Sequence, residues 1–280
     1  MKKIYLIILI SAISGSLSAQ STSSGNPSRT TAKSEKEQRK LKRIKVFKEQ
    51  EEGENVFQRD FSLGGRLNTD GWSGFFELGY RKSRKVVNYF QFEFSEKKSL
   101  KEYKQQGYAP TDMGIASRPY VYGKQNNFYP VKLGIGQRYL IGGKANKNGV
   151  EVSAIYYGGI SIGLLKPYYL SVNVGNDQIK EIKYDPNGPY KDAFLDQYAV
   201  TGGGGFGKGW SEVSVVPGLH AKLGMRFDWA HFNEVVSALE CGVNAEMYTK
   251  KIPIMINEGN KQFIFNAYVG LQFGKRWNKR

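Results

Sequence analysis

Residues 219–229, which read Leu-His-Ala-Lys-Leu-Gly-Met-Arg-Phe-Asp-Trp, decide the fold. Every odd position is apolar, and the even positions carry His220, Lys222, Gly224, Arg226 and Asp228. Successive side chains of a β-strand point to opposite faces. This stretch therefore predicts a strand with one apolar face and one charged face, and a closed barrel in lipid is one way to satisfy both.

The same two-residue period recurs in seven other segments of the chain. They cover residues 61–67, 72–81, 89–94, 131–138, 150–156, 235–247 and 263–273. Alternation alone also fits a soluble sandwich. Four of the eight segments are 10 to 13 residues long, however, which is long for soluble strands and suits a tilted membrane crossing. We expect an all-β fold, a closed antiparallel transmembrane β-barrel of eight strands, with ten strands as the alternative.

Aromatic residues near the segment ends support a membrane setting. The six that we expect at the membrane interface are Trp72, Tyr80, Tyr139, Tyr156, Trp229 and Trp277. Outer-membrane barrels carry aromatic girdles at both interfaces of their apolar band. Short and long connections also alternate along the chain, which predicts short periplasmic turns, long outer loops at 96–127 and 165–214, and both termini in the periplasm.

Charged residues occupy the positions that would face the barrel interior. The predicted interior network comprises Asp60, Arg66, Glu77, Glu93, Lys132, Arg138, Glu151, Lys222, Arg226, Asp228, Glu240 and Glu246. Eight strands leave an interior that side chains can just fill. Buried charges are tolerated when they are paired. We therefore expect a plug of salt bridges, whereas ten or more strands would let the same residues line a narrow polar channel.

The N-terminal region differs from the rest of the chain. Lys2 and Lys3, an apolar run at 4–13 and the ending Ser18-Ala19 predict a secretory signal peptide over residues 1–19. Residues 20–56 then form a charged periplasmic tail or linker, in which 34–54 is either a short helix or a solvated tether. The barrel spans 57–277, and 278–280 form a basic C-terminal tail.

The charge balance bears on partners. The formal charge of +16 falls to +14 once Lys2 and Lys3 leave with the signal peptide. An exported chain rarely meets nucleic acid, so this charge favours an anionic membrane face or an acidic protein. Basic residues concentrate on the proposed periplasmic rim, at 81–85, 144–147 and 275–280.

Catalytic and cofactor signals are weak. His220 and Asp228 lie eight residues apart on one strand, about 26 Å at 3.3 Å per residue, so they cannot form one dyad. The glycine-rich run 202–209 lacks the Ser or Thr that a phosphate-binding loop needs after Lys208, and we expect a flexible loop there. We predict no catalytic residue, metal site, cofactor or nucleotide, and a surface enzyme is the least favoured alternative.

Several runs resemble the small outer-membrane β-barrels of Bacteroidota. They are 156–170 (Tyr-Tyr-Gly-Gly-Ile-Ser-Ile-Gly-Leu-Leu-Lys-Pro-Tyr-Tyr-Leu), 217–219, 250–255 and 273–277. The resemblance implies a barrel in the outer membrane, similar in build to accessory barrels of the barrel-assembly or type IX secretion machinery. It brings no catalytic residues. One departure is the terminal Asn278-Lys279-Arg280, which follows the usual final aromatic residue.

These observations lead to one preferred function and an alternative. We expect a non-enzymatic accessory or scaffold subunit of a larger cell-envelope complex, in contact with outer-membrane lipid and other envelope proteins. The alternative is a small porin or transporter for polar solutes. The long outer loops favour the first, because loops of that length are usually functional or disordered.

Overall fold

The computed structural model describes residues 38, 40, 41, 57–107, 118–144, 148–175, 178–256 and 260–278. Contacts divide the chain into two units, Met1–Lys48 and Glu49–Arg280. In the first unit Gln38, Lys40 and Leu41 are helical and exposed. The expected signal peptide and almost all of the expected tail at 20–56 lie outside the described residues.

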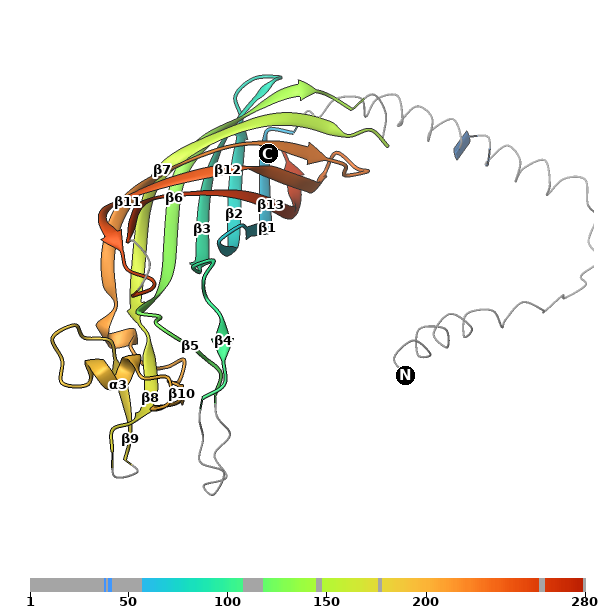
Figure 1. Cartoon of the computed structure of the whole chain (residues 1–280). Helices are drawn as coiled ribbons and strands as arrows, with labels where there is room; N and C mark the ends of the chain where they lie inside the picture. Colours follow the sequence, from blue (N-terminus) through green and yellow to red (C-terminus); the bar gives the residue numbers. More distant parts are fainter. Residues whose placement is uncertain are drawn as a thin grey trace, which may run out of the picture. The chain divides into compact units, whose positions relative to one another are not determined.

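The second unit contains a closed barrel of eight strands, all paired antiparallel (Figure 1). In spatial order the strands are β1 (Arg59–Asn68), β13 (Lys261–Trp277), β12 (Val235–Ile252), β11 (Ser214–Asp228), β7 (Glu151–Pro167), β6 (Asn126–Gly142), β3 (Val86–Lys97) and β2 (Gly71–Arg81). The predicted all-β closed barrel of eight strands is confirmed.

The strands are staggered around the barrel. The path of paired residues that begins at Asp60 passes through Gly79, Tyr89, Gly136, Tyr157, Lys222, Asn244 and Asn266. In the pairing of β1 with β13, Asn68 lies opposite Tyr268. The same register continued by two residues places residue 70 opposite Asn266. The path therefore returns to β1 ten residues beyond its start, and this shear tilts the strands and fixes the barrel's diameter.

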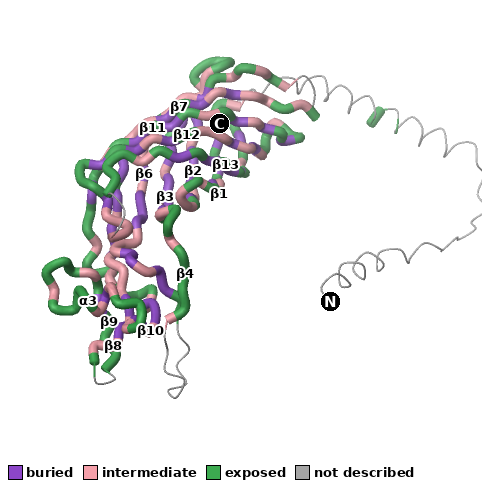
Figure 2. Tube along the Cα trace, in the orientation of Figure 1, coloured by how far each residue is buried: buried purple, intermediate pink, exposed green. Residues whose placement is uncertain are grey.

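The two faces of the barrel wall differ in polarity. Outward side chains are apolar and exposed, including Leu63, Leu67, Ile135, Leu223 and Phe265, while the residues between them are buried (Figure 2). An apolar exterior around a polar interior is the arrangement of a barrel that crosses lipid with every strand paired. Among the described residues, no helix combines the length and the hydropathy that a membrane crossing requires.

The two ends of the barrel carry different connections. At the terminal end, where β1 begins and β13 ends, short segments at 82–85, 143–150 and 229–234 join the strands. At the opposite, loop end, the Thr69-Asp70 turn joins β1 to β2, and longer segments follow at 98–125, 168–213 and 253–260. The alternation of short and long connections matches the prediction, but at the loop end the strands are longer than expected and the connections correspondingly shorter. β12, for example, reaches Ile252.

The segment 168–213 is folded rather than a simple loop. It forms a three-stranded sheet in the order β10 (Val200–Gly203), β8 (Tyr169–Asn173) and β9 (Ile179–Lys183), with a short helix α3 (Lys191–Leu195) and a 3-10 turn η2 (Trp210–Glu212). We call this segment the outer subdomain. The glycine run at 202–209 was predicted to be a flexible loop, and this was wrong at Gly202 and Gly203, which pair with Ser171 and Leu170 of β8.

An apolar core holds the outer subdomain together. The buried side chains are Tyr120, Leu170, Val172, Ile182, Phe194 and Val200. Tyr120 comes from β5 (Tyr120–Val121), which pairs with β4 (Lys104–Gln105) in the other long connection. The two long connections therefore share one core at the loop end.

Candidate functional site

Glu93 of β3 is the centre of the barrel's interior charge network. Its carboxylate accepts hydrogen bonds from Arg66 at 2.6 Å, Lys132 at 3.0 Å and Lys222 at 2.7 Å. All four side chains are almost completely buried. They come from β1, β3, β6 and β11, so the one carboxylate ties together four strands of the barrel. Hydrogen bonds between ionised partners are stronger than neutral ones, so this carboxylate contributes strongly to holding the four strands together.

Ion pairs extend from this node toward the loop end. Arg66 also bonds Glu240, and Lys132 bonds Glu246 at 2.6 Å. Lys97 joins Glu246 at 2.9 Å to Asp70 at 2.8 Å. The central cluster thus contains four cations and four anions, namely Arg66, Lys97, Lys132 and Lys222 with Asp70, Glu93, Glu240 and Glu246. Its formal charges balance.

Aromatic side chains complete this central cluster. The Tyr268 hydroxyl donates to Glu240 at 2.8 Å, and the Tyr248 hydroxyl donates to Glu246 at 2.7 Å. The guanidinium carbon of Arg66 lies 3.5 Å from the ring centroid of Phe75, within the range of a cation–π contact. Glu240 thus accepts from both Arg66 and Tyr268, and Glu246 accepts from Tyr248 through the oxygen that Lys132 and Lys97 do not contact.

A second charged cluster lies toward the terminal end. Arg138 bridges Asp60 at 2.8 Å and Glu77 at 2.5 Å, and Arg226 contacts Glu77 at 3.2 Å. In the same region Arg276 pairs with Asp228, and Lys144 lies 3.5 Å from Asp228. Paired charges therefore occupy the middle and the terminal end of the interior, whereas the loop end holds a buried apolar cluster of Phe128, Leu165, Val216, Tyr248 and Ile252.

The structure brings together eleven of the twelve residues expected in the interior network. Each of the eleven is buried and forms at least one ion pair. Glu151 is the exception in burial. It is partly exposed and lines a cavity of about 220 Å³ at the terminal end, together with Arg81, Lys85, Arg138 and Lys144.

Sequence reasoning missed Asp70, Lys97, Lys144 and Arg276 as interior partners. Lys97 follows Glu93 by four residues and Arg276 follows Gln272 by four, so both continue the two-residue period of their strands. Arg276 was assigned to the basic periplasmic rim, and that assignment was wrong because β13 continues to Trp277 and keeps Arg276 buried. The outward positions just before them, Glu96 and Lys275, are charged, so the apolar alternation ends before it reaches Lys97 and Arg276.

His220 lies inside the barrel beside a residue from the neighbouring strand. Its Nδ1 lies 3.0 Å from the Oγ of Ser161, and its ring packs on Tyr157 with centroids 5.0 Å apart. Histidine and serine are both buried, and the cavities described at the two barrel ends are lined by other residues. The pair is an interior hydrogen bond. No group of three or more metal-ligating side chains occurs among the described residues.

The six expected interface aromatics are all exposed. Tyr80, Tyr139, Trp229 and Trp277 lie near strand ends at the terminal end, and Trp72 lies near the loop end. The sixth, Tyr156, lies away from the ends of its strand: it is the sixth residue of β7, and its hydroxyl contacts Gln137 in the adjacent strand.

Rings from four elements stack along the barrel's outer surface at the loop end. Trp72 meets Phe94 edge-on, Phe94 stacks on Tyr129 with centroids 6.1 Å apart, and Tyr129 stacks on Trp210 of η2 at 5.8 Å. Tyr129 is buried although it faces outward, because Trp210 covers it. This ladder fixes η2 of the outer subdomain against the barrel wall.

Two further contacts fasten η2. The Lys166 ammonium lies between the rings of Phe206 and Trp210, 4.5 and 4.7 Å from their centroids. Glu212 accepts from Lys183 at 2.5 Å and from the Tyr169 hydroxyl at 2.8 Å. The hydrogen bond from Lys183 lowers the pKa of Glu212, and the same bond raises the pKa of Lys183. The stacked aromatic rings and the Lys166 ammonium thus attach the subdomain to the barrel, and the Glu212 bonds hold η2 within the subdomain.

Comparison with known proteins finds similarity among solved structures. No protein-family model matches the chain, and no curated protein matches it. Among solved structures it is similar to the N-terminal β-barrel domain of Pseudomonas aeruginosa OprF (9% identity, 79% of this chain and 98% of that one, TM-score 0.33).

It is also similar to Neisserial surface protein A (9% identity, 78% and 94% of the two chains, TM-score 0.35) and to a major outer membrane protein from Thermus thermophilus (10% identity, 77% and 98%, TM-score 0.38). At these identities and scores the likeness carries no argument. The fold rests on the strand pairing and the burial pattern of this chain.

Proposed function

We propose that this chain is a non-enzymatic outer-membrane β-barrel that serves as an accessory or scaffold subunit of a larger complex in the cell envelope, one that assembles or secretes proteins. The observation that supports this most is the combination of a barrel interior occupied by buried ion pairs and an apolar cluster with an outer subdomain that has its own apolar core. The first suits an anchor, and the second suits a platform for a partner.

The interior supports anchoring rather than transport. An ion path through the barrel would have to break pairs such as Arg66–Glu93 and Arg138–Glu77, whose side chains are almost completely buried. Removing one partner of a buried pair costs about 3–5 kcal/mol, because the other charge remains uncompensated. A solute would meet that cost repeatedly along the barrel axis.

The loop end supports partner binding. Tyr198 of the outer subdomain is 86% exposed, Tyr103 in the other long connection is 75% exposed, and Ile179 and Tyr190 are also exposed. Protein interfaces are enriched in tyrosine, and their strongest contacts are often tyrosine side chains. The outer subdomain that carries Ile179, Tyr190 and Tyr198 has a buried core of its own, and a folded platform lowers the conformational entropy lost on binding.

The termini are proposed to lie in the periplasm. Lys82, Arg84 and Lys85 are exposed in the β2–β3 connection at the terminal end. Basic side chains at this end suit contact with phospholipid headgroups or with acidic periplasmic proteins. The outer subdomain then lies on the outer side of the membrane.

Deletion of the outer subdomain tests the proposal. β7 and β11 pair as far as Leu165 opposite Ser214, so residues 168–213 can be replaced by a short Gly/Ser turn without changing the barrel register. After gentle extraction through a C-terminal tag, we expect the full chain to bring down subunits of an assembly or secretion complex, identified by mass spectrometry. The deletion variant should remain in the outer membrane and lose them.

A matched control is a variant with the same tag that lacks residues 20–56, which shows whether partners bind through the N-terminal segment instead. A full-length protein that is always recovered as a lone monomer would contradict a role as a subunit. Partners retained in full by the subdomain deletion would contradict the assignment of docking to the outer subdomain.

A further inference from the structure

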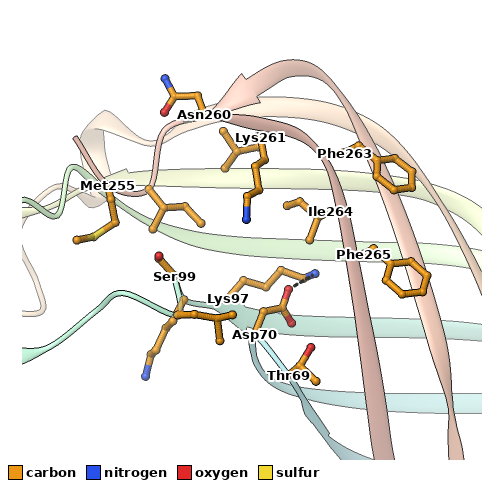
Figure 3. Close-up of a pocket in the computed structure, with 14 residues that line it drawn as sticks. Thr69, Asp70, Lys97, Ser99, Met255, Asn260, Lys261, Phe263, Ile264 and Phe265 are labelled. Carbon is orange, nitrogen blue, oxygen red and sulfur yellow. Dashed lines mark hydrogen bonds and ion pairs between the residues drawn. The ribbon is translucent and has the colours of Figure 1, made fainter. Parts of the chain in front are cut away.

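Strand β13 keeps an open edge at the loop end of the barrel. Its pairing with β1 stops at Tyr268 opposite Asn68, with one further bond from the Thr69 amide to the Ala267 carbonyl. β13 extends beyond this point over residues 261–266, while β1 has already turned into β2. A lateral notch therefore opens above the Thr69-Asp70 turn, between β13 and the segment that follows β3 (Figure 3).

The register shows which backbone groups point into the notch. The Ala267 carbonyl points toward β1, because it accepts the Thr69 amide. The direction of the peptide groups alternates along a strand, so the N–H and C=O groups of Phe265 and Phe263 point to the same side as those of Ala267. On its other side β13 stays paired with β12, as far as Phe263 opposite Met247. Within the described residues, the backbone groups of Phe263 and Phe265 have no hydrogen-bond partner on the side of the notch.

These unpaired groups lie beside an apolar surface. The side chains of Phe263 and Phe265 are 58% and 63% exposed and lie on the same outward face of β13 as Leu271 and Phe273. Figure 3 shows both rings on the outside of the wall. Hydrocarbon offers no hydrogen bonds, so unpaired backbone groups at its border cost free energy. A further strand paired with β13 would remove this cost.

β13 also lacks the charges that protect other edge strands from pairing. β9, an edge strand of the outer subdomain, carries Lys180, Glu181 and Lys183 within five residues. Charged side chains, lysine above all, discourage pairing at a strand edge. Residues 263–265 of β13 read Phe-Ile-Phe and carry no charge. The edge of β13 is therefore open to a further strand, whereas charge protects the edge of β9.

An apolar wall closes the inner side of the notch. The notch encloses a cavity of about 380 Å³, within the range of about 300–1,000 Å³ that is usual for ligand sites. Ile264 lies between the two outward phenylalanines, so its side chain points to the opposite face, into the cavity. The other apolar side chains of the lining are Leu100, Ile252, Ile254 and Met255.

We propose that the notch binds an extended polypeptide segment as an added strand on the edge of β13. The segment continues the β1–β13 ladder above the Thr69-Asp70 turn and bonds the backbone groups of Phe263 and Phe265. Its main chain supplies affinity, and its alternate side chains enter the cavity, where the isoleucines select apolar residues. None of the described residues that line the notch belongs to the outer subdomain, so this binding does not depend on the partner docking proposed for that segment.

Hydrogen exchange with a strand-forming peptide tests the proposal. The probe is the heptapeptide Thr-Val-Thr-Val-Thr-Val-Thr, added in excess to the full chain in detergent micelles, and amide exchange is followed by NMR. We expect the amides of Phe263 and Phe265 to exchange rapidly in the chain alone and at least about tenfold more slowly with the peptide. The amide of Ile264, which points to β12, should be protected in both states. This alternate pattern distinguishes strand addition from binding through side chains alone.

A proline variant isolates the contribution of the backbone. Phe265→Pro removes one N–H from the open edge and leaves the β12 pairing intact, because proline is tolerated where the N–H faces away from the neighbouring strand. It should weaken binding of a labelled peptide, measured by fluorescence anisotropy, about tenfold, the order expected when edge hydrogen bonds are lost. Phe265→Leu is the matched control, since it changes the same side chain but keeps the N–H, and it should bind like the native chain. Folding of both variants is checked by heat-modifiable migration in gels.

Two methylated peptides give the same test without any variant. Residues opposite each other in an antiparallel pair share a face, so the threonines lie opposite the outward phenylalanines and donate to β13. The valines then enter the cavity. N-methylation of the threonines should abolish binding, and N-methylation of the valines should leave most of it.

Four outcomes would overturn the proposal. They are amides of Phe263 and Phe265 that are already protected in the chain alone, no slowing of their exchange with the peptide, equal binding to Phe265→Pro and Phe265→Leu, and equal binding of the two methylated peptides. A dimer of the chain that Phe265→Pro dissociates would assign the edge to a second copy instead.

Discussion

The barrel and the outer subdomain bury opposite kinds of side chain although both are built from β-strands. Inside the barrel most of the buried groups are charged or polar, such as Arg66, Glu93 and Lys132, apart from the apolar cluster around Phe128 at the loop end. Inside the subdomain they are apolar side chains such as Leu170 and Phe194. The difference follows from the solvent outside each region, because lipid requires apolar outward faces and water does not.

This contrast shows how far a two-residue period can be interpreted. The period establishes that a strand has two different faces, but the surroundings decide which face is inside. In the barrel the apolar face is exposed, as Leu223 and Phe265 show. In a water-soluble protein the same two-residue period would place the apolar face inside and the charged face outside.

The largest effect is expected from Glu93→Gln. This change leaves Arg66, Lys132 and Lys222 without the carboxylate that they share, at a cost of about 3–5 kcal/mol in the free energy of unfolding. Urea unfolding of the detergent-folded protein, followed by tryptophan fluorescence, measures it. Glu181→Gln, which removes an exposed pair with Lys208, is the control and should change little. Equal effects would show that the interior pairs carry no special weight.

A charge on the outer face should cost somewhat less. Phe92 faces outward in the middle of β3 and stacks on Phe76 with centroids 5.2 Å apart. Phe92→Arg should destabilise the barrel in lipid vesicles by about 2–4 kcal/mol, the cost of arginine at the bilayer midplane. Phe92→Leu is the matched control. A neutral arginine variant would mean that this face does not meet hydrocarbon.

A small change in the subdomain core should have a local effect. Ile182→Val removes one methylene group from a buried side chain and should cost about 0.5–1.5 kcal/mol. Hydrogen exchange of β8 and β9 should accelerate while exchange in the barrel strands stays unchanged. Faster exchange throughout the barrel would show that the two regions unfold as one unit.

The smallest effect is expected at Glu212. Because its pKa is lowered in the folded chain by the hydrogen bond from Lys183, its stabilising contribution is present above the unfolded pKa near 4.5 and disappears as pH falls through the lower folded value. Glu212→Gln should remove this acid dependence and cost less than about 1 kcal/mol at neutral pH, since the pair is largely exposed. Hydrogen exchange of η2 between pH 3 and pH 6, corrected for the intrinsic rate, measures the acid dependence and the cost of the substitution. A pH profile that is the same in the native chain and in Glu212→Gln would contradict the role of the pair.

The sequence predicts the barrel better than the outer subdomain for a physical reason. A membrane strand must alternate over its whole length, so segments such as 219–229 carry a repeated signal. In the subdomain, β8 has five residues and β10 has four, and their burial depends on contacts with Tyr120 and α3. Such short strands give almost no periodic signal. The interior partners Lys97 and Arg276 were missed because the outward residues before them, Glu96 and Lys275, are charged and interrupt the apolar alternation.

Conductance across a planar lipid bilayer tests the central claim most directly, namely that buried ion pairs and an apolar cluster close the barrel interior and make it an anchor. The purified full-length chain, inserted at a density confirmed by fluorescent labelling of Cys241 or of a tag, should give no steady ionic current above that of the bare bilayer. Stable, stepwise open currents from the native chain would contradict the claim and support a channel instead.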